Sequence, residues 1–253
     1  MKPKKQLRCC STISDRQGRQ ILAIDKIVKD IDVAVTDIED GATLLISGFG
    51  ISGRPWQLSD AILRKGVKDL TVISTNAGVA DIGLGGLILE GRVRRLICSF
   101  PRGKGMWAIK KRIKTGKIEV EVFPWGTLVE KIRAGGAGLG GILTPTGVDT
   151  DMTTGRKIVE INGIQHALEP ALKADFALVH ARRGDRWGNL CYHLGARNFN
   201  PVMAMGAKVT IAQVEELVEL GEIDPNRIHT PGIYVQKVVP VSGQFPLAQE
   251  NQG

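Results

Sequence analysis

Short apolar runs alternate with helix-like stretches along the first half of the chain, and this alternation constrains the fold more than any other feature. The runs Thr43–Ser47, Leu70–Ser74 and Arg95–Cys98 predict buried strands, because they are short and rich in branched residues. Pro55–Lys65 between the first two predicts a helix, since proline is well placed in a first helical turn. Strands and helices in this order predict a mainly parallel sheet flanked by helices.

The flanking segments extend this pattern. Ile27, Ile31, Val35 and Ile38 recur at spacings of four and three, which predicts a helix over Asp25–Asp40. Further along the chain, a basic amphipathic stretch spans Ala108–Lys114. Three more strands are expected, at Ile118–Val122, Asp175–His180 and Lys208–Ala212.

Residues 157–168 break the α/β pattern. Two alternating segments, Lys157–Ile161 and Ile164–Leu168, are joined by Asn162-Gly163. That dipeptide favours a type I′ turn, so a β-hairpin insertion is expected here. The sequence therefore predicts one α/β domain over residues 25–240, with a basic, disordered leader at 1–24 and a flexible tail at 241–253.

Charge and composition exclude several classes of function. Of the eight net positive charges, five fall within the first twenty residues, so the body is only modestly basic and suits a small anionic ligand. Aromatic residues make up 5% of the chain, which argues against a base-stacking nucleic-acid surface. No apolar run reaches the roughly 18 residues of a membrane span. The four cysteines and four histidines show no metal-ligand spacing, and the cysteine pattern favours a reducing, cytoplasmic location.

Two glycine-rich segments match the pattern G-x-G-x-x-G. One is Gly48–Gly53, between a predicted strand and a predicted helix, and the other is Gly136–Gly141. In that context the pattern can bind a pyrophosphate, so a nucleotide-binding regulatory protein is one alternative. The chain has 31 glycines, however, and chance matches are expected in such a composition. A turn that needs positive φ is the other interpretation.

Longer motifs carry a family resemblance. The segment Asp40–Pro55 contains Asp-Gly, apolar residues, Gly-Phe-Gly and Gly-Arg-Pro, and it resembles the signature of the α subunit of family I coenzyme A transferases, with Ser47 in place of one glycine. Further matches follow in the family's order and cover about residues 26–239: Val67–Gly78, Gly126–Gly138, Thr144–Gly147, Ala196–Pro201 and His229–Tyr234. The resemblance is strongest to enzymes that act on acetate, butyrate or 3-oxo acids.

This resemblance implies a ping-pong reaction. A glutamate carboxylate attacks an acyl-CoA, and CoA passes through a glutamyl thioester to a second carboxylic acid. In two-chain members of the family, that glutamate lies in a Glu-Asn-Gly motif of the β subunit. No such motif occurs in this sequence. The nearest match is Glu250-Asn251, which is followed by Gln252 instead of glycine. The implied assembly is a heterodimer or heterotetramer with a β subunit, with coenzyme A as substrate, no bound cofactor and no catalytic residue in this chain.

The resemblance also implies which residues of this chain contact the acyl-CoA. They are Gly48, Phe49, Gly50, Gly53, Asn76, Trp125, Gly126, Gly135, Gly136 and Gly138. Trp125 stands where relatives carry a glutamine that helps to hold the oxyanion, and an indole offers only one donor and no acceptor. A hydrolase of acyl-CoA or C–C bonds, with water replacing the second acid, is therefore an alternative on the same fold.

Overall fold

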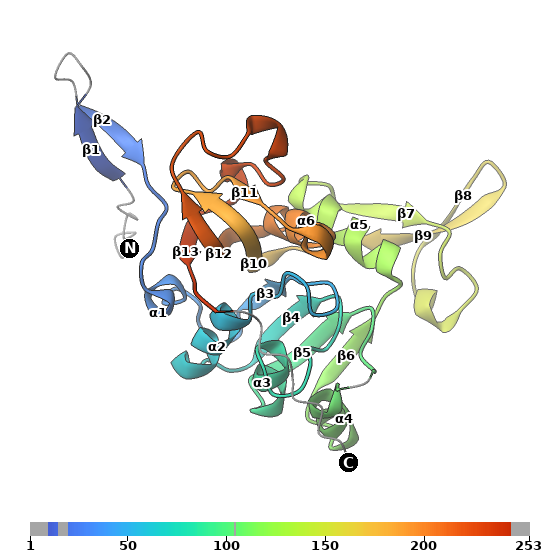
Figure 1. Ribbon diagram of the computed structural model, residues 1–253. Helices are drawn as coiled ribbons and strands as arrows, with labels where there is room; N and C mark the ends of the chain where they lie inside the picture. The colour runs from blue at the N-terminus through green and yellow to red at the C-terminus, as the bar shows by residue number, and fades with distance from the viewer. Residues whose placement is uncertain (1–9, 15–19, 104, 244–253) are drawn as a thin grey trace, which may run out of the picture.

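A computed structural model describes residues 10–14, 20–103 and 105–243, and its centre is a parallel sheet. Seven strands follow the order β13-β12-β10-β3-β4-β5-β6, all parallel, and a short β11 pairs antiparallel with β10 (Figure 1). Their bounds are β3 Thr43–Ile46, β4 Leu70–Ser74, β5 Val93–Cys98, β6 Glu119–Val122, β10 Ala174–Asp185, β11 Leu190–Cys191, β12 Ala207–Val218 and β13 Lys237–Pro240. The expected parallel sheet is confirmed.

Helices cover both faces of this sheet. Because successive side chains of a strand point to opposite faces, Leu44 and Ile46 of β3 pack into one core while Leu45 packs into the other. The first core holds side chains of α1–α4 and the second those of α5 and α6. Their bounds are α1 Ile31–Ala34, α2 Trp56–Lys65, α3 Leu84–Leu89, α4 Trp107–Lys114, α5 Trp125–Gly136 and α6 Asn200–Met205.

The helix expected over Asp25–Asp40 is much shorter in the structure. Only Ile31–Ala34 is helical, because the preceding backbone lies along the edge strand β13. The Val28 N–H donates to the Val238 carbonyl at 2.8 Å, and the Val238 N–H donates to the Lys26 carbonyl at 2.8 Å. The spacing of apolar residues is equally compatible with this extended pairing followed by one helical turn, so the helix prediction was wrong on both sides of Ile31–Ala34.

A second, antiparallel sheet projects from the body at the right of Figure 1. Its strands β7 (Gly141–Thr144), β8 (Ile158–Ile161) and β9 (Ile164–Pro170) follow the order β7-β9-β8. At the β8–β9 turn, Asn162 and Gly163 have φ of +52° and +74°, as a type I′ turn requires. The predicted hairpin is confirmed, and β7 adds a third strand to it.

The segment expected to be a disordered leader contains a strand pair. β1 (Cys10–Ser14) and β2 (Gln20–Ile24) pair antiparallel, in a stretch where Thr12, Ile13 and Ile21 favour extended backbone. The rest of the predicted leader and most of the predicted tail lie outside the described residues. Over the part of the chain that the structure describes, no helix is long and apolar enough to cross a membrane.

Candidate active site

The carboxyl ends of four neighbouring strands bring most of the predicted site residues together. β3 runs into Ser47–Gly53, β4 into Thr75–Gly78, β5 into Ser99–Phe100 and β6 into Phe123–Trp125. From β3 the sheet grows toward β6 on one side, and from β10 toward β13 on the other. Ligands of open α/β sheets bind at such a reversal of strand order, outside the carboxyl ends. The loop after β3 lies at that point.

The glycine loop after β3 forms a tight turn. The Phe49 N–H donates to the Ser52 carbonyl at 2.9 Å and the Ser52 N–H donates back at 3.0 Å, with Gly50 at φ +60° between them. The turn presents Phe49 and Ile51 to solvent, at 36% and 49% exposure. A helix does not follow directly after Gly53, since α2 begins only at Trp56. The loop therefore differs from a dinucleotide fingerprint, in which the third glycine opens the helix.

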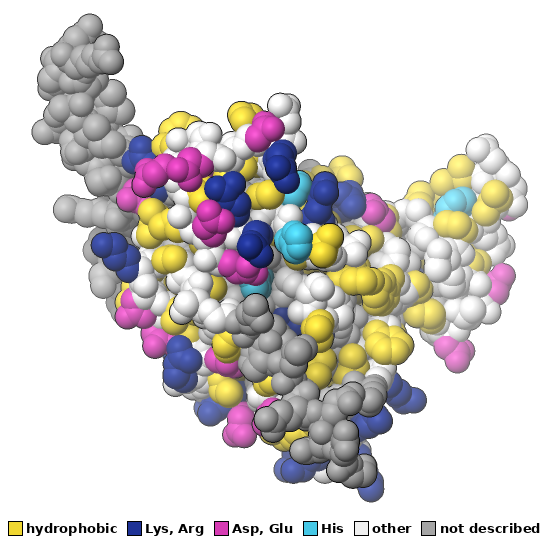
Figure 2. Space-filling view, in the orientation of Figure 1, with side chains coloured by type: hydrophobic (Ala, Val, Ile, Leu, Met, Phe, Trp, Pro, Cys, Tyr) yellow, Lys and Arg dark blue, Asp and Glu magenta, His cyan; other side chains and the backbone are white. Residues whose placement is uncertain are grey.

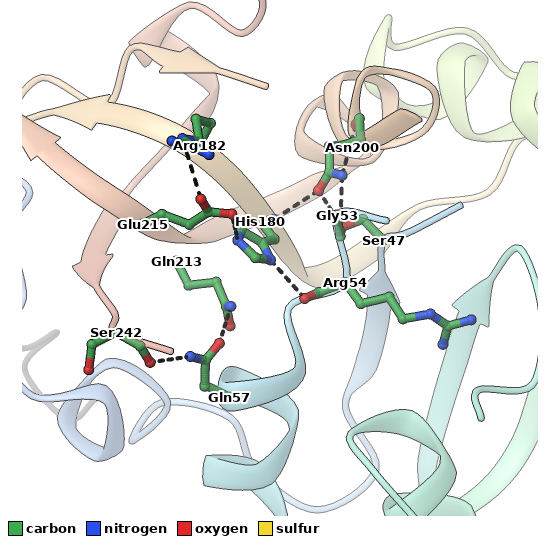
Figure 3. Close-up of polar contacts among 11 residues, drawn as sticks. Ser47, Gly53, Arg54, Gln57, His180, Arg182, Asn200, Gln213, Glu215 and Ser242 are labelled. Carbon is green, nitrogen blue, oxygen red and sulfur yellow. Dashed lines mark hydrogen bonds and ion pairs between the residues drawn. The ribbon is translucent and has the colours of Figure 1, made fainter. Parts of the chain in front are cut away.

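Asn200 of α6 fixes the far side of the loop. Its Nδ2 donates to the carbonyls of Gly53 (3.1 Å) and Ala196 (2.9 Å), while its Oδ1 accepts from the His180 N–H (2.8 Å) and from the Ser47 hydroxyl. These four bonds use both donors and both lone pairs of an amide that is fully buried. Figure 3 shows Asn200 of α6 meeting Ser47 and Gly53 of the loop after β3.

His180 continues this support from β10. Its Nδ1 lies 2.9 Å from the Arg54 carbonyl, and its Nε2 lies 3.1 Å from Glu215 Oε1 on β12. Arg182 pairs with the other oxygen of Glu215 at 3.5 Å (Figure 3). The backbone just after the glycine loop is thus held by two strands of the sheet.

Arg54 lies beneath the loop. Gly48 makes room for it, since a Cβ at position 48 would lie 2.6 Å from Arg54 Cγ. The guanidinium donates through Nε to the Gly50 carbonyl and through Nη2 to Asn76 Oδ1 at 2.8 Å. Burial lowers its pKa from 12.5 to about 10, so it is still charged at neutral pH.

Hydrogen bonds fix the orientation of the Asn76 side chain, which follows β4. Its Oδ1 accepts from Arg54 and from the Gly78 N–H at 3.0 Å. Both lone pairs of the oxygen are therefore occupied, and the side chain presents its Nδ2 donors to the remaining space. No residue in the described ranges accepts from that Nδ2, which makes it a donor available to a ligand.

Three aromatic rings line the outer part of the site. Trp125 lies edge-on to Phe49, with centroids 5.2 Å apart, and edge-on to Phe199 at 5.6 Å. Trp125 is 41% exposed, while Phe199 is buried. In Figure 2, hydrophobic side chains gather on this face over α5, α6 and the loop after β3. The site is an open apolar surface with polar groups at its base.

The structure separates the predicted glycines into two groups. Trp125 and Gly126 begin α5 at the carboxyl edge, and nothing lies within 4 Å of a Cβ built on Gly126. Gly135, Gly136 and Gly138 lie at the other end of this helix, about 15 Å away at 1.5 Å per residue. There, a Cβ on Gly135 would lie 1.9 Å from the Leu172 carbonyl oxygen, so close packing alone requires that glycine.

Sequence reasoning did not identify Arg54, Phe199 or Asn200 as parts of the site. Arg54 directly follows the last glycine of the loop, and the other two belong to the motif Ala196–Pro201. The motif was a signal for Phe199 and Asn200, but only the folded chain shows that α6 packs beside the loop after β3. In the described ranges no three potential metal ligands cluster.

Two cavities are lined by other residues. One of about 290 Å³ is lined by Trp56, Asp60 and Arg64 of α2 together with the chain that follows the carboxyl end of β13. Another of about 400 Å³ lies at the amino edge, beside Asp40, Asp175 and Lys208. Neither contains the predicted acyl-CoA residues. At the carboxyl-edge site, Phe49 and Trp125 are exposed at the surface.

Fold and site together define an α/β protein with a candidate ligand site at the switch point of a parallel sheet, formed by a glycine loop, an amide and aromatic side chains. A family model described as coenzyme A transferase matches residues 28–240, so the chain belongs to the coenzyme A transferase family. The resemblance seen in the sequence is confirmed.

Curated relatives match over nearly their full length. The chain is 50% identical over 220 residues to one subunit of the 3-oxoadipate CoA-transferase of Pseudomonas putida, covering 87% of this chain and 95% of the relative. It is 44% identical over 215 residues to the corresponding subunit of the succinyl-CoA:3-ketoacid coenzyme A transferase of Helicobacter pylori strain J99, covering 85% and 92%.

Solved structures agree on the fold. Glutaconate coenzyme A-transferase from Acidaminococcus fermentans superposes with a TM-score of 0.76 at 22% identity, covering 85% of this chain and 75% of that one. The decarboxylase AibA/AibB superposes at 0.74 with 27% identity, covering 86% and 84%. The fold thus occurs with more than one named reaction, and function has to be argued from the site.

Proposed function

We propose that this chain is the α subunit of a heteromeric CoA-transferase that moves CoA from a short acyl-CoA to a carboxylic acid, 3-oxo acids among them. The observation that carries the proposal is the family match together with the placement of Asn76 and the glycine loop at one edge. The curated relatives are named as subunits, which supports a β subunit in the role of partner. The cytoplasmic location expected from the cysteine pattern stays a prediction.

The family resemblance implies the order in which bonds form and break in the reaction. A glutamate carboxylate on the partner chain attacks the thioester carbon, the C–S bond breaks, and CoA leaves as thiolate while a mixed anhydride forms. The thiolate then attacks the glutamyl carbonyl and releases the free acid. The second acid reverses both steps, so each half-reaction breaks one acyl bond and forms another without an added reactant.

In these reaction steps, the role of this chain is to stabilise the negative charge that forms on the thioester oxygen. Attack on the thioester turns its carbonyl oxygen into an oxyanion, which needs donors fixed in advance. Asn76 Nδ2 is such a donor, since Arg54 and the Gly78 N–H occupy its oxygen. The first turn of α5, at Trp125 and Gly126, adds unpaired N–H groups and the positive end of the helix dipole.

The predicted contacts form two classes in this proposal. Gly48, Phe49, Gly50 and Gly53 shape the wall beside the acyl group, because the loop they form flanks Asn76 through Arg54. Gly135 and Gly136 fit better as packing residues of α5 than as ligand contacts, and Gly138, just after the helix, has a φ of +77° that explains its glycine. Their assignment to CoA binding therefore has weaker support than that of the loop.

A second candidate is a hydrolase on the same fold, and Trp125 favours it. Its ring contacts Phe49 and Phe199, and so fills space beside the site with an apolar group. A smaller acceptor such as water would then take the place of the second acid. The two candidates differ in product, since a hydrolase releases free CoA and a transferase makes a new CoA ester.

The test uses the native assembly. The chain is purified gently from its host, the co-purifying partner is identified by native mass spectrometry, and the complex is assayed with short acyl-CoA donors and acids. We expect a partner with a Glu-Asn-Gly motif, a new CoA ester as product, and thermal stabilisation by CoA esters. Release of free CoA alone would favour the hydrolase, and stabilisation by NAD or ATP but not by CoA esters would favour a nucleotide-binding regulator.

A further inference from the structure

Two leucine and isoleucine side chains close to the candidate site are almost fully exposed. Leu194 is 75% exposed and Ile233 is 79% exposed, the highest values for large hydrophobic side chains within residues 24–103 and 105–243. Leu194 begins the 3-10 helix η2 (Leu194–Arg197), and Ile233 lies in η4 (Gly232–Tyr234). Trp187, in the turn between β10 and β11, is 47% exposed. Single exposed hydrophobic residues are ordinary, but a group of them on one face marks a contact surface.

The segment with Leu194 continues the surface of the glycine loop after β3. A Cβ built on Gly195 would lie 3.5 Å from the Ser52 Oγ and 3.9 Å from the Phe49 ring. Phe49 in turn lies edge-on to Trp125 in the aromatic cluster of the site. Leu194 therefore extends the apolar surface of the candidate site outward and does not belong to a separate patch.

A buried polar scaffold fixes Trp187 and Ile233. The Asp185 carboxylate is 3% exposed and accepts from the N–H groups of Trp187 at 2.9 Å and of Asn189 at 3.0 Å. Asn189 Oδ1 accepts from the Gly232 N–H at 2.9 Å. A Cβ on Gly232 would lie 2.2 Å from the Trp187 carbonyl oxygen, so the two loops pack backbone to backbone. Because these loops are already ordered, a partner that binds them pays little for ordering them.

Leu194 has a backbone conformation that leucine rarely adopts. Its φ is +44°, in the left-handed region. The chain is fixed on both sides, since the Tyr192 N–H donates to His229 Nδ1 at 2.8 Å and the Ala196 N–H donates to the His193 carbonyl at 3.1 Å. Strain of this kind persists where the surroundings enforce it, and it is concentrated at functional surfaces. Glycine would remove the strain, so a leucine here is explained if its side chain makes a contact.

Two arginines border the same face. Arg197 ends η2, and Arg227 lies two residues before His229; both arginines are exposed. Burial and the charges of these two arginines lower the pKa of His229. Among the residues whose placement is described, no carboxylate lies within ion-pair distance of either arginine. Figure 2 shows Lys, Arg and His side chains gathered over β11 and α6. A partner that covers this face is therefore expected to bring carboxylates.

We propose that the β subunit docks on this face, with apolar side chains over Leu194 and Ile233 and carboxylates opposite the two arginines. The inference rests on the proposed function, in which a glutamate of the partner chain has to reach the loop after β3. A subunit that delivers this glutamate must cover the surface next to that loop. In a contact between two copies of this chain, the same arginines would meet in one interface, so a partner of opposite charge fits better.

The projecting sheet is the rival surface and supplies the matched control. It exposes Leu143 and Ile164, at 42% and 56%. It stands off from the body in Figure 1 and is tied to α5 by the Lys131–Glu169 pair. A substitution at Ile164 therefore tests an exposed apolar position that lies outside the proposed docking face.

The experiment measures assembly with the β subunit that is recovered with this chain from its host. The two chains are co-expressed, and the Kd of the purified complex is measured by sedimentation on dilution. Leu194→Asp and Ile233→Asp are each expected to raise the Kd about 30-fold or more, as substitutions of central contact residues do. Ile164→Asp should change the Kd by less than about threefold.

Two further variants keep the test independent of folding. Leu194→Gly removes the side chain at a φ that glycine adopts freely, so the fold is retained, and the Kd should still rise about tenfold. Arg197→Glu should weaken the complex, and more at low salt than at high salt. Arg94→Glu, at an exposed position of β5, makes the same change of charge and should have little effect.

The outcomes separate the docking face from the reaction. Unchanged Kd values for Leu194→Asp, Ile233→Asp and Leu194→Gly would overturn the inference, as would a complex weakened by Ile164→Asp alone. Self-association of this chain that Ile233→Asp abolishes, with assembly with the β subunit unaffected, would assign the face to a second copy and also overturn it. A wild-type complex that assembles through this face but transfers no CoA would count against the proposed function only.

Discussion

Single residues of the glycine loop have different physical reasons to be glycine. Gly50 and Gly53 both have positive φ, at +60° and +64°. A Cβ on Gly50 would meet nothing within 4 Å, whereas a Cβ on Gly53 would lie 2.5 Å from Asn200 Nδ2 and 2.6 Å from Ala196 Cβ. Backbone conformation explains the first glycine, and close packing against α6 adds to it at the second.

This difference predicts unequal effects of one substitution. Gly50→Ala should cost about 1–2 kcal/mol of stability, the backbone penalty for a left-handed residue. Gly53→Ala should cost clearly more, about 3 kcal/mol or above, because Asn200 must also move and gives up hydrogen bonds. Urea unfolding at a constant m-value measures both. Equal losses for the two variants would contradict the packing described around Gly53.

For single residues, the sequence predicted the glycine loop but not the side chains that hold it in place. Gly48, Phe49, Gly50 and Gly53 were predicted as site residues from their motif, and they do lie at the carboxyl edge. Arg54 and Asn200 were not, because their roles depend on contacts over 22 and 147 residues of chain. A pattern of neighbouring residues does not contain such contacts.

Among the elements, α5 links the site to the projecting sheet. Trp125 begins the helix at the aromatic cluster, and Lys131 in its middle pairs with Glu169 of β9. Both side chains are only 3% exposed, and Lys131 also lies 4.1 Å from the centre of the Phe123 ring. Arg156 shares Glu169 at 3.1 Å. The orientation of α5 therefore depends on a buried ionic contact.

Lys131→Met should destabilise the protein by about 2–4 kcal/mol, because it leaves Glu169 buried with Arg156 as its remaining partner. Arg133→Met on the same helix is the matched control. Its pair with Glu130 is about half exposed, so a change below about 0.5 kcal/mol is expected. Thermal unfolding of both variants checks this. A loss in Lys131→Met no greater than in the control would show that the buried pair does not hold α5.

Element prediction succeeded where a short apolar run marks a buried strand and failed where a distant partner decides between helix and extended backbone. The ranges Thr43–Ser47 and Leu70–Ser74 and the hairpin at Asn162-Gly163 were found from local pattern alone. The segment from Asp25 was not, because its extended backbone is fixed by hydrogen bonds to β13, about 210 residues later. Local periodicity carries no information on that partner.

For the whole molecule, we expect low pH to weaken two ion pairs at the amino edge of the sheet, Lys237–Asp37 and Lys208–Asp175. Hydrogen bonds from Lys237 and Lys208 hold the pKa of Asp37 and Asp175, respectively, below the usual 3.8. Asp175 also accepts from the Thr43 N–H at 3.0 Å. A carboxyl group with a lowered folded pKa contributes its stability above the unfolded pKa and loses it as pH falls through the folded one.

The free energy of unfolding contributed by these pairs should therefore be constant from pH 7 to 5 and should fall below about pH 4. Both carboxylates are partly exposed, so the effect of each is small. Urea titrations at several pH values test this in the wild type and in Asp37→Asn/Asp175→Asn. The double variant should lose less stability between pH 5 and 3 than the wild type, and parallel curves would contradict the assignment.

For the whole molecule, this chain presents hydrogen-bond donors at the carboxyl edge of its sheet but has no Glu-Asn-Gly motif, so we expect the partner chain to supply the glutamate. The most direct test is intact mass spectrometry of the complex after incubation with an acyl-CoA and no acceptor acid. We predict a CoA adduct on the partner chain, at its Glu-Asn-Gly glutamate, and none on this chain. An adduct on this chain, or transfer by this chain alone, would contradict the account.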